Sequence, residues 1–375
     1  MTGTVPAKQS AAVVRGGAWD STQAVPRTIE VLQKLGYSVT VLCWDMLGER
    51  PAVESKDNFK IIRYQRRVGK AGVKYFCLWP LWWIWLIRQF IIGKYDIVHV
   101  MNLDTVIPAI LSRPICGHKI VYDIRDPWGL CLTGQPFPIP QIFSALDRIF
   151  TPFVDGLLLS QGDVRACALY FGRRACQRVP VVQVLNVPQR DLGKNYRVPE
   201  GNPVRINYSG HISINRAALF LVEAIRGCKG VEMDVVGYVR DKQLKETLQS
   251  LDNVNLYGRV PHADAIKLMD KADLISLLYN PCMKVALISS ANKMFEAMML
   301  GKPYICTEGT YPAQVARQFN LGWALPYGDV SALRSLLNKL VKNPELLVSA
   351  GRNGRAAYEK YFRWENQKAN LIALY

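Results

Sequence analysis

The densest group of side chains able to do chemistry lies in residues 289–303, which read SSANKMFEAMMLGKP. Residues three and four apart share one face of a helix, so Asn292, Lys293 and Glu296 are predicted to gather within the first two turns. A carboxylate there can accept hydrogen bonds from both hydroxyls of a ribose, and a lysine beside it can meet phosphate charge. Ser290 or Asn292 is expected to cap the start of this helix.

A second polar group follows the predicted strand at residues 204–208. The small residue Gly210 and the imidazole of His211 come next, and Arg216 is predicted in the first turn of a helix that runs to about Ile225. Exposed backbone amides and a guanidinium in that turn can together hold a diphosphate, although an arginine on a solvated helix face gives the same pattern. Of the histidines, only His211 is expected to reach a ligand.

A glycine pair, Gly16 and Gly17, follows the first predicted strand. Glycine lets a backbone approach a phosphate closely, but a tight turn into the next helix explains the pair equally well. The dinucleotide-binding pattern G-x-G-x-x-G is missing here. This loop is therefore a weaker indication than the two groups above.

The elements that must position these residues alternate between short apolar strands and helices, which is typical of parallel α/β architecture. The expected strands lie at residues 11–14, 38–42, 96–100, 119–122, 156–159, 204–208, 231–236, 253–257, 274–278 and 303–306. A polar, proline-containing stretch separates the two sets. We expect two Rossmann-like, doubly wound domains facing each other across a cleft, at residues 1–190 and 191–355. Residues 356–375 are expected to form a helix that crosses back to the first domain.

Composition limits the partners and the compartment. The chain has 375 residues and a net charge of +17, which favours polyanions, but no nucleic-acid-binding module is recognisable. Its nine cysteines are odd in number and never spaced C-x-x-C, which argues against a disulfide framework or a zinc site. The N-terminal sequence lacks a signal-peptide pattern. These observations predict a cytoplasmic protein, a monomer or a homodimer, without a metal or other cofactor.

One segment suggests a membrane surface. Residues 58–95 contain no acidic side chain, and the cations there are Lys60, Arg63, Arg66, Arg67, Lys70, Lys74, Arg88 and Lys94. The same segment contains a predicted helix over residues 80–92 that carries or adjoins Trp79, Trp82, Trp83 and Trp85. Such a helix is about 20 Å long, short of the roughly 30 Å of a hydrocarbon core. We expect it to lie on the inner face of an anionic membrane, with a buried core or dimer-interface helix as the alternative.

The 289–303 motif resembles the donor-binding helix of GT-B glycosyltransferases, family 4 (group 1) in particular. Further similarities are the strand DIVHV at 96–100, the segment VYDIRD at 121–126, the segment NVNLYGRV at 253–260 and the closing YFRWE at 361–365. The resemblance covers nearly the whole chain. It implies transfer of a sugar from a nucleoside-diphosphate sugar to an acceptor, with retention of configuration and without a metal.

Roles follow from the resemblance position by position. Glu296 would bind the donor ribose, and Arg216 and Lys293 the diphosphate; these two and Asp126 are the catalytic candidates. Asp126 would face the sugar and the acceptor. The remaining donor-binding candidates are Gly16, Gly17, Gly210, His211, Arg259, Val260, Ser290 and Asn292. Together with the membrane segment, the resemblance predicts a lipid-linked or glycan acceptor.

Two positions depart from the family pattern. Ile288 stands where the family has the first glutamate of E-x7-E, and Arg125 replaces the histidine of the segment that precedes Asp126. Both changes concern the sugar pocket, so an inverting reaction with Asp126 as general base is the rival to retention. A nucleotide-sugar epimerase of the same fold, and a peripheral membrane scaffold with little activity, are the alternative functions.

Overall fold

The computed structural model describes residues 9–56, 58–68, 73–132, 135–162, 170, 178–193 and 197–375. The chain forms two compact units. Unit 1 contains Met1–Leu185 and Gln367–Tyr375, and unit 2 contains Asn186–Asn366. The boundaries expected from the sequence were after residues 190 and 355. Lys70, one of the cations expected at the membrane, lies outside the described residues.

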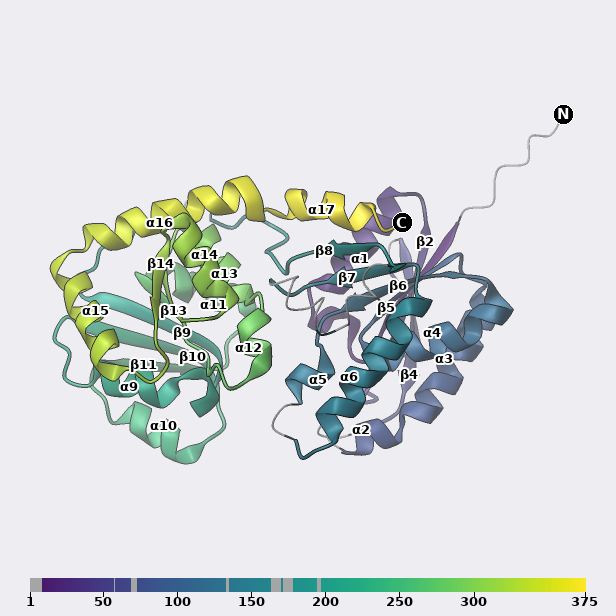
Figure 1. Ribbon diagram of the computed structural model, residues 1–375, viewed down its shortest axis with the longest axis horizontal. Helices are drawn as coiled ribbons and strands as arrows, with labels where there is room; N and C mark the ends of the chain where they lie inside the picture. The colour runs from purple at the N-terminus through teal and green to yellow at the C-terminus, as the bar shows by residue number, and fades with distance from the viewer. Residues whose placement is uncertain are drawn as a thin grey trace. The chain divides into compact units, whose positions relative to one another are not determined.

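Unit 1 is built on a sheet whose described strands run in the order β3-β4-β2-β1-β5-β6-β7-β8 (Figure 1). Their bounds are β1 Ser10–Arg15, β2 Ser38–Asp45, β3 Val53–Lys56, β4 Phe59–Gln65, β5 Ile97–Met101, β6 Lys119–Ile124, β7 Gly156–Leu159 and β8 Val181–Gln183. Paired strands are parallel except β3 and β4, which are antiparallel. The central strands β1 and β5 are almost entirely buried, as expected for a parallel sheet covered on both faces.

Helices cover this sheet. Their bounds are α1 Ala24–Lys34, α2 Val73–Cys77, α3 Trp79–Gly93, α4 Leu103–Cys116, α5 Trp128–Cys131, α6 Ile139–Phe150 and α17 Trp364–Ile372. The first helix packs its buried side chains, among them Val25, Ile29 and Leu32, against β1 and β2. Gly36 follows its end at φ +91°, a backbone angle that favours glycine.

The expected helix over residues 80–92 exists as α3, but two of its tryptophans are buried. Trp79 and Trp82 are 7% and 0% exposed, and Trp82 packs on Trp44 with ring centroids 5.4 Å apart. Trp83 is half-buried and donates its indole N–H to the Asp104 carbonyl at 2.9 Å. Trp85 stacks on Trp82 at 5.2 Å. The prediction that Trp79 and Trp82 face a membrane is wrong, because their side chains are buried against the sheet and its neighbouring helices. Trp83 and Trp85 are only partly buried, so for them it stays a prediction.

The basic segment that precedes α3 is also more structured than its composition indicates. β4 carries Arg63, which is 5% exposed and forms an ion pair with Glu54 of β3. Arg63 therefore stabilises this strand pair and is not one of the surface cations that were expected. β3, β4 and β8 in unit 1 and one strand in unit 2 were not identified from the sequence. Within the described residues, no helix combines the length and the apolar character needed to cross a bilayer.

Unit 2 contains a parallel sheet in the order β11-β10-β9-β12-β13-β14 (Figure 1). The strands are β9 Val204–Ile212, β10 Val231–Val239, β11 Val254–Gly258, β12 Leu274–Leu277, β13 Tyr304–Thr307 and β14 Gly322–Leu325. The helices are α9 Ala218–Ile225, α10 Lys242–Gln249, α11 His262–Lys271, α12 Lys284–Ile288, α13 Asn292–Met299, α14 Tyr311–Phe319, α15 Val330–Lys342 and α16 Glu345–Ala357, followed by a π-helical turn at Tyr358–Phe362. Because all six strands run in one direction, the loops after them gather at one edge of the sheet.

Candidate active site

A cavity of about 530 Å³ opens at the carboxyl edge of the unit 2 sheet. Its walls come from the ends of β9 and β10, the loop after β11, and helices α11 and α13. Its lining includes most of the predicted donor-binding residues, namely Gly210, His211, Arg259, Val260, Asn292, Lys293 and Glu296. Residues far apart in the sequence are thus brought to one place by the parallel strand order.

A smaller cavity of about 270 Å³ contains the two remaining unit 2 candidates, Arg216 and Ser290. Asn292 and Lys293 line both cavities, so the start of α13 forms their shared wall. The rest of the smaller lining is largely apolar and comes from Met283, Val285, Ala286 and Ala291, with Tyr279 and Ser289. The larger and the smaller cavity therefore lie on either side of Lys293.

The Lys293 amine lies over Gly210. A Cβ built on Gly210 would come within 2.6 Å of Nζ, and φ at this residue is +108°, so only glycine fits without strain. Burial lowers the pKa of Lys293, while nearby Glu296 acts to raise it. Burial and the neighbouring Arg216 and Arg240 likewise lower the pKa of His211. The site is strongly electropositive before any ligand enters.

Among the described residues that line the larger cavity, Glu296 is the one that carries a carboxylate. Its Oε1 lies 2.9 Å from Nε2 of His262, the first residue of α11. This hydrogen bond raises the pKa of His262. His262 was expected to be a structural histidine, but it lines the cavity beside the predicted ribose ligand.

The local structure at two predicted positions differs from expectation. α13 begins at Asn292 with Ala291 as its N-cap, and no side chain caps it, so neither Ser290 nor Asn292 plays that part. Asn292 instead accepts a hydrogen bond from Asn186 at 2.6 Å. Arg216 lies in a short 3-10 turn, Ile214–Arg216, and α9 begins only at Ala218.

Arg216 is held by an aromatic side chain. Its guanidinium carbon lies 5.4 Å from the ring centroid of Tyr279, within the range of a cation–π contact. Tyr279 follows β12, and its backbone N–H donates to the Thr307 hydroxyl at 3.0 Å. Tyr279 and Arg240 were missed from the sequence, although each follows a strand at the edge where ligands bind in such sheets.

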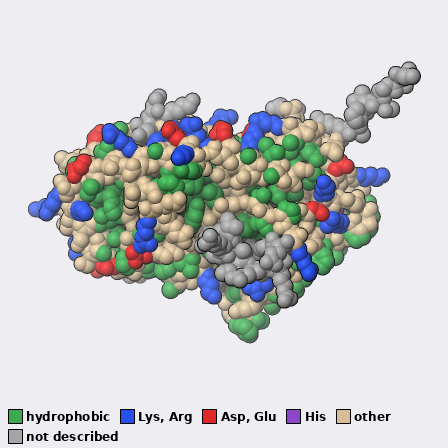
Figure 2. Space-filling model, turned by 45° about the horizontal axis from the view of Figure 1, so that its top comes forward, with side chains coloured by type: hydrophobic (Ala, Val, Ile, Leu, Met, Phe, Trp, Pro, Cys, Tyr) green, Lys and Arg blue, Asp and Glu red, His purple; other side chains and the backbone are tan. Residues whose placement is uncertain are grey.

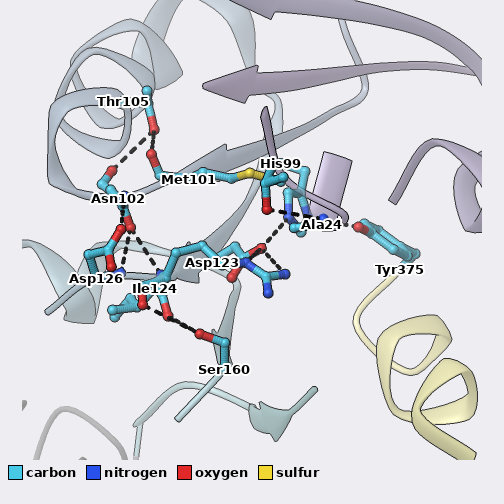
Figure 3. A network of polar contacts seen from close by, with 12 residues as sticks. Ala24, His99, Met101, Asn102, Thr105, Asp123, Ile124, Asp126, Ser160 and Tyr375 are labelled. Carbon is cyan, nitrogen blue, oxygen red and sulfur yellow. Dashed lines mark hydrogen bonds and ion pairs between the residues drawn. The ribbon is translucent and has the colours of Figure 1, made fainter. Parts of the chain in front are cut away.

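In unit 1, Asp126 lies just after β6 and is exposed. Asn102, after β5, holds the loop: its Oδ1 accepts hydrogen bonds from the backbone N–H groups of Arg125 and Asp126 at 2.9 and 3.0 Å (Figure 3). Asn102 itself has φ +66°, a conformation that asparagine tolerates better than most residues. The hydrogen bonds to Asn102 therefore hold the backbone that carries Asp126.

Behind this loop lies a buried polar network (Figure 3). Asp123 contacts His99 at 3.3 Å and Arg125 at 2.7 Å, and the Tyr375 hydroxyl lies 2.7 Å from Nδ1 of His99. Burial acts to raise the pKa of Asp123, but the Arg125 guanidinium holds it below its ordinary value. The arginine that replaces the family's histidine thus turns inward as a partner of Asp123.

The glycine pair lies after β1, next to a buried carboxyl group. A Cβ on Gly16 would fall 1.7 Å from Oδ2 of Asp104 and 2.7 Å from the Tyr75 hydroxyl. Tyr75 donates to Asp104 at 2.9 Å, and burial raises the pKa of Asp104 to about 7. At Gly17 the nearest atom, Nε of Arg15, would be 3.9 Å away. Packing alone therefore requires a glycine at position 16 but not at position 17.

Comparison with known proteins identifies unit 2. Residues 203–343 match the family model described as glycosyl transferases group 1. They form a group 1 glycosyltransferase domain. The prediction of a glycosyltransferase is confirmed by this match, and the prediction of a GT-B fold by the solved structures that follow. No curated protein sequence matches the chain.

Several solved structures share the fold of the whole chain. Sucrose-phosphate synthase from Thermosynechococcus elongatus is 15% identical with a TM-score of 0.79, and 98% of each chain is covered. Alr3699/HepE from Anabaena, in complex with UDP and glucose, is 13% identical with a TM-score of 0.68 and the same coverage. A glycosyltransferase from Rickettsia africae is 15% identical with a TM-score of 0.67, again covering 98% of each chain.

The two adjacent glycines give a matched test of the unit 1 loop. Gly16→Ala should lower the free energy of unfolding by about 1–3 kcal/mol, because the new methyl group overlaps Asp104. Gly17→Ala should change it by less than about 0.5 kcal/mol. Urea unfolding followed by tryptophan fluorescence measures both, since most of the tryptophans lie in unit 1. Equal stability of the two variants would show that Asp104 does not fill the space at Gly16.

Proposed function

We propose that this glycosyltransferase moves a sugar from a nucleoside-diphosphate sugar to a membrane-associated, lipid-linked or glycan acceptor, with retention and without a metal. The observation that carries the donor assignment is the meeting of Gly210, Arg259 and Glu296 in one cavity, although they come from different elements. The nucleoside occupies the larger cavity, with its ribose at Glu296 and its base near Val260. The sugar occupies the smaller cavity.

The diphosphate lies where the two cavities share a wall. Lys293 lines both, Arg216 lines the smaller one, and Arg259 lines the larger one. When the bond between the sugar and the diphosphate breaks, negative charge grows on the leaving phosphate oxygen. Fixed cations stabilise that charge without having to reorganise, which is the work that a divalent metal does in other transferases. Because Glu296 accepts hydrogen bonds from the ribose, its carboxylate does not neutralise these cations, which remain available to the phosphates.

Retention fits the lining of the sugar compartment. Its described lining residues include no carboxylate, so none of them is a base that could activate an acceptor for inversion. Asp126 of unit 1 is the candidate that faces the transferred sugar and the acceptor, as the resemblance implies. Its fixed backbone and exposed carboxylate suit that role.

The outer side of three helices in unit 1 supports the proposal of a membrane-associated acceptor. α3 packs on α4, and α4 packs on α6. Large apolar side chains on them face solvent, namely Leu81, Ile84, Ile91, Ile92, Leu111, Ile115, Ile139, Ile142 and Ile149. We call these residues the apolar face. Its exposed members are aliphatic, in place of the tryptophans expected from the sequence.

Charge on the same helices favours an anionic surface. Arg88 and Arg148 are exposed, whereas the carboxylates on the three helices, Asp104 and Asp147, are buried. The chain as a whole carries a net charge of +17. On the side of the molecule drawn in Figure 2, Lys and Arg side chains lie among patches of hydrophobic ones. Exposed aliphatic side chains with cations among them are the pattern of proteins that bind the inner, anionic face of a membrane peripherally.

The donor assignment predicts that Glu296→Ala binds UDP about 10- to 100-fold more weakly than the wild type. The substitution removes hydrogen bonds to a charged group, which contribute about 1.5–3 kcal/mol. Isothermal titration with UDP and with GDP measures the change. Glu308→Ala, which removes an exposed carboxylate outside both cavities, is the matched control and should bind as the wild type does. Unchanged affinity in Glu296→Ala would contradict the ribose assignment.

Metal independence predicts that sugar transfer continues in excess EDTA. The rate should instead fall by about 10²–10³-fold in Lys293→Ala, because one fixed charge on the leaving group is lost. Transfer from radiolabelled UDP-sugars and GDP-sugars to membrane lipid extracts is the assay. Loss of activity in EDTA that magnesium or manganese restores would show that a metal carries the diphosphate charge.

The apolar face predicts that replacing Ile84, Ile92 and Ile115 by serine releases the protein from anionic vesicles. Each buried isoleucine contributes about 1.5–3 kcal/mol, so the triple variant should lose nearly all binding. Sedimentation with vesicles of phosphatidylcholine and phosphatidylglycerol measures this, and UDP affinity should stay unchanged. Leu47→Ser, another exposed apolar residue of unit 1, is the control. Sedimentation of the triple variant at the wild-type level would rule out this face as the membrane contact.

A further inference from the structure

A histidine from one helix holds the predicted ribose ligand on another. His262 opens α11, and Glu296 lies in the second turn of α13. Their Nε2 and Oε1 atoms are 2.9 Å apart, and both residues line the larger cavity. The side chain of His262 is 67% exposed and that of Glu296 only 14% exposed. The imidazole therefore reaches from the rim of the cavity to a carboxylate on its wall.

This contact leaves most of the carboxylate available. A carboxylate offers about four lone-pair positions on its two oxygens. His262 uses one of them on Oε1, and no described residue donates to Oε2. Two ribose hydroxyls can be accepted without breaking the hydrogen bond to His262. The histidine is thus compatible with a bound nucleotide and need not leave.

A flexible glutamate in this cavity has another partner within reach. Lys293 lies three residues earlier on the same helix, where side chains are neighbours. Burial lowers the pKa of Lys293, and the charge of Glu296 acts to raise it, so the two groups are close enough to interact. Among the described residues no ion pair joins them, because Glu296 is paired with His262. An ion pair with Lys293 would turn the carboxylate away from a ribose and neutralise a cation that the diphosphate needs.

We propose that His262 is a positioning residue that holds Glu296 toward the ribose and thereby sets the preference of the site for ribonucleotides over deoxyribonucleotides. The inference rests on the proposed donor site. It assigns His262 no contact with the reacting atoms. The hydrogen bond that raises the pKa of His262 is the same one that fixes the carboxylate.

The test compares UDP and GDP with their 2′,3′-dideoxy analogues by isothermal titration. In the wild type the ribonucleotide should bind at least about tenfold more tightly, since two hydrogen bonds to a carboxylate are at stake. In His262→Ala the affinity for the ribonucleotide should fall toward that of the analogue, while the affinity for the analogue stays unchanged. His262→Gln, whose amide can still donate to Glu296, should recover part of the preference. Lys267→Ala, an exposed position on the same helix, should behave as the wild type.

Three outcomes would overturn the inference. An equal loss for both nucleotides in His262→Ala would mean that the imidazole contacts the base or the phosphates. Tighter binding of the ribonucleotide would mean that His262 competes with the ribose for Glu296. An unchanged preference would mean that Glu296 is held without it. Thermal unfolding of each variant checks that the fold is intact.

The same data separate this inference from the donor assignment. If the wild type discriminates and Glu296→Ala does not, the ribose site stands whatever the His262 variants show. If the wild type binds both nucleotides equally and Glu296→Ala changes nothing, the ribose site itself is wrong. Only a change of preference in His262→Ala, with the ribose site intact, supports a positioning role.

Discussion

The half-buried ammonium of Lys293 is the group around which the cavities of unit 2 are arranged. Moving a cation out of water costs free energy unless an opposite charge meets it, and no described carboxylate forms an ion pair with this one. The backbone at Gly210 leaves room for it because a side chain at that position would overlap Nζ. An anionic ligand at the junction of the two cavities recovers that cost. In the proposed donor site, the diphosphate would be that ligand.

The two units place different polar residues at the same edge of their sheets. In each, a parallel sheet brings the loops after its strands to one edge. Unit 2 fills that edge with cations and one carboxylate, whereas unit 1 places Asp126, Asn102 and the Gly16 loop there. Unit 1 also buries its own polar network, in which Asp123 is satisfied by His99 and Arg125. In unit 1, the hydrogen-bonded network around Asp123 holds the backbone that carries Asp126. In unit 2, Lys293 has no ion-pair partner among the described residues and can attract an anionic ligand.

The sequence predicted what is local and missed what depends on distant contacts. The helix α13 and its polar residues could be predicted because their spacing is set by one helix. His262 could not be linked to Glu296, since the two lie on different helices and no pattern relates them. Trp79 and Trp82 were misplaced because a helix that is apolar almost all round does not show which side is covered. Arg63 was counted as a surface cation because its partner, Glu54, lies on a strand that was not identified.

The position of Ile288 shows how the sugar compartment differs from the family pattern. Ile288 ends α12, is 5% exposed, and packs in the interior, so no carboxylate approaches the sugar from there. The chain then passes through Ser289 to the start of α13, where no side chain caps the helix. The first backbone N–H groups of a helix have no partner within it and attract oxygen atoms of a ligand. If the smaller cavity holds the sugar, as proposed, the backbone at the start of α13, together with Ser289 and Ser290, can provide polar contacts in place of that glutamate, beside the apolar side chains that line much of the rest.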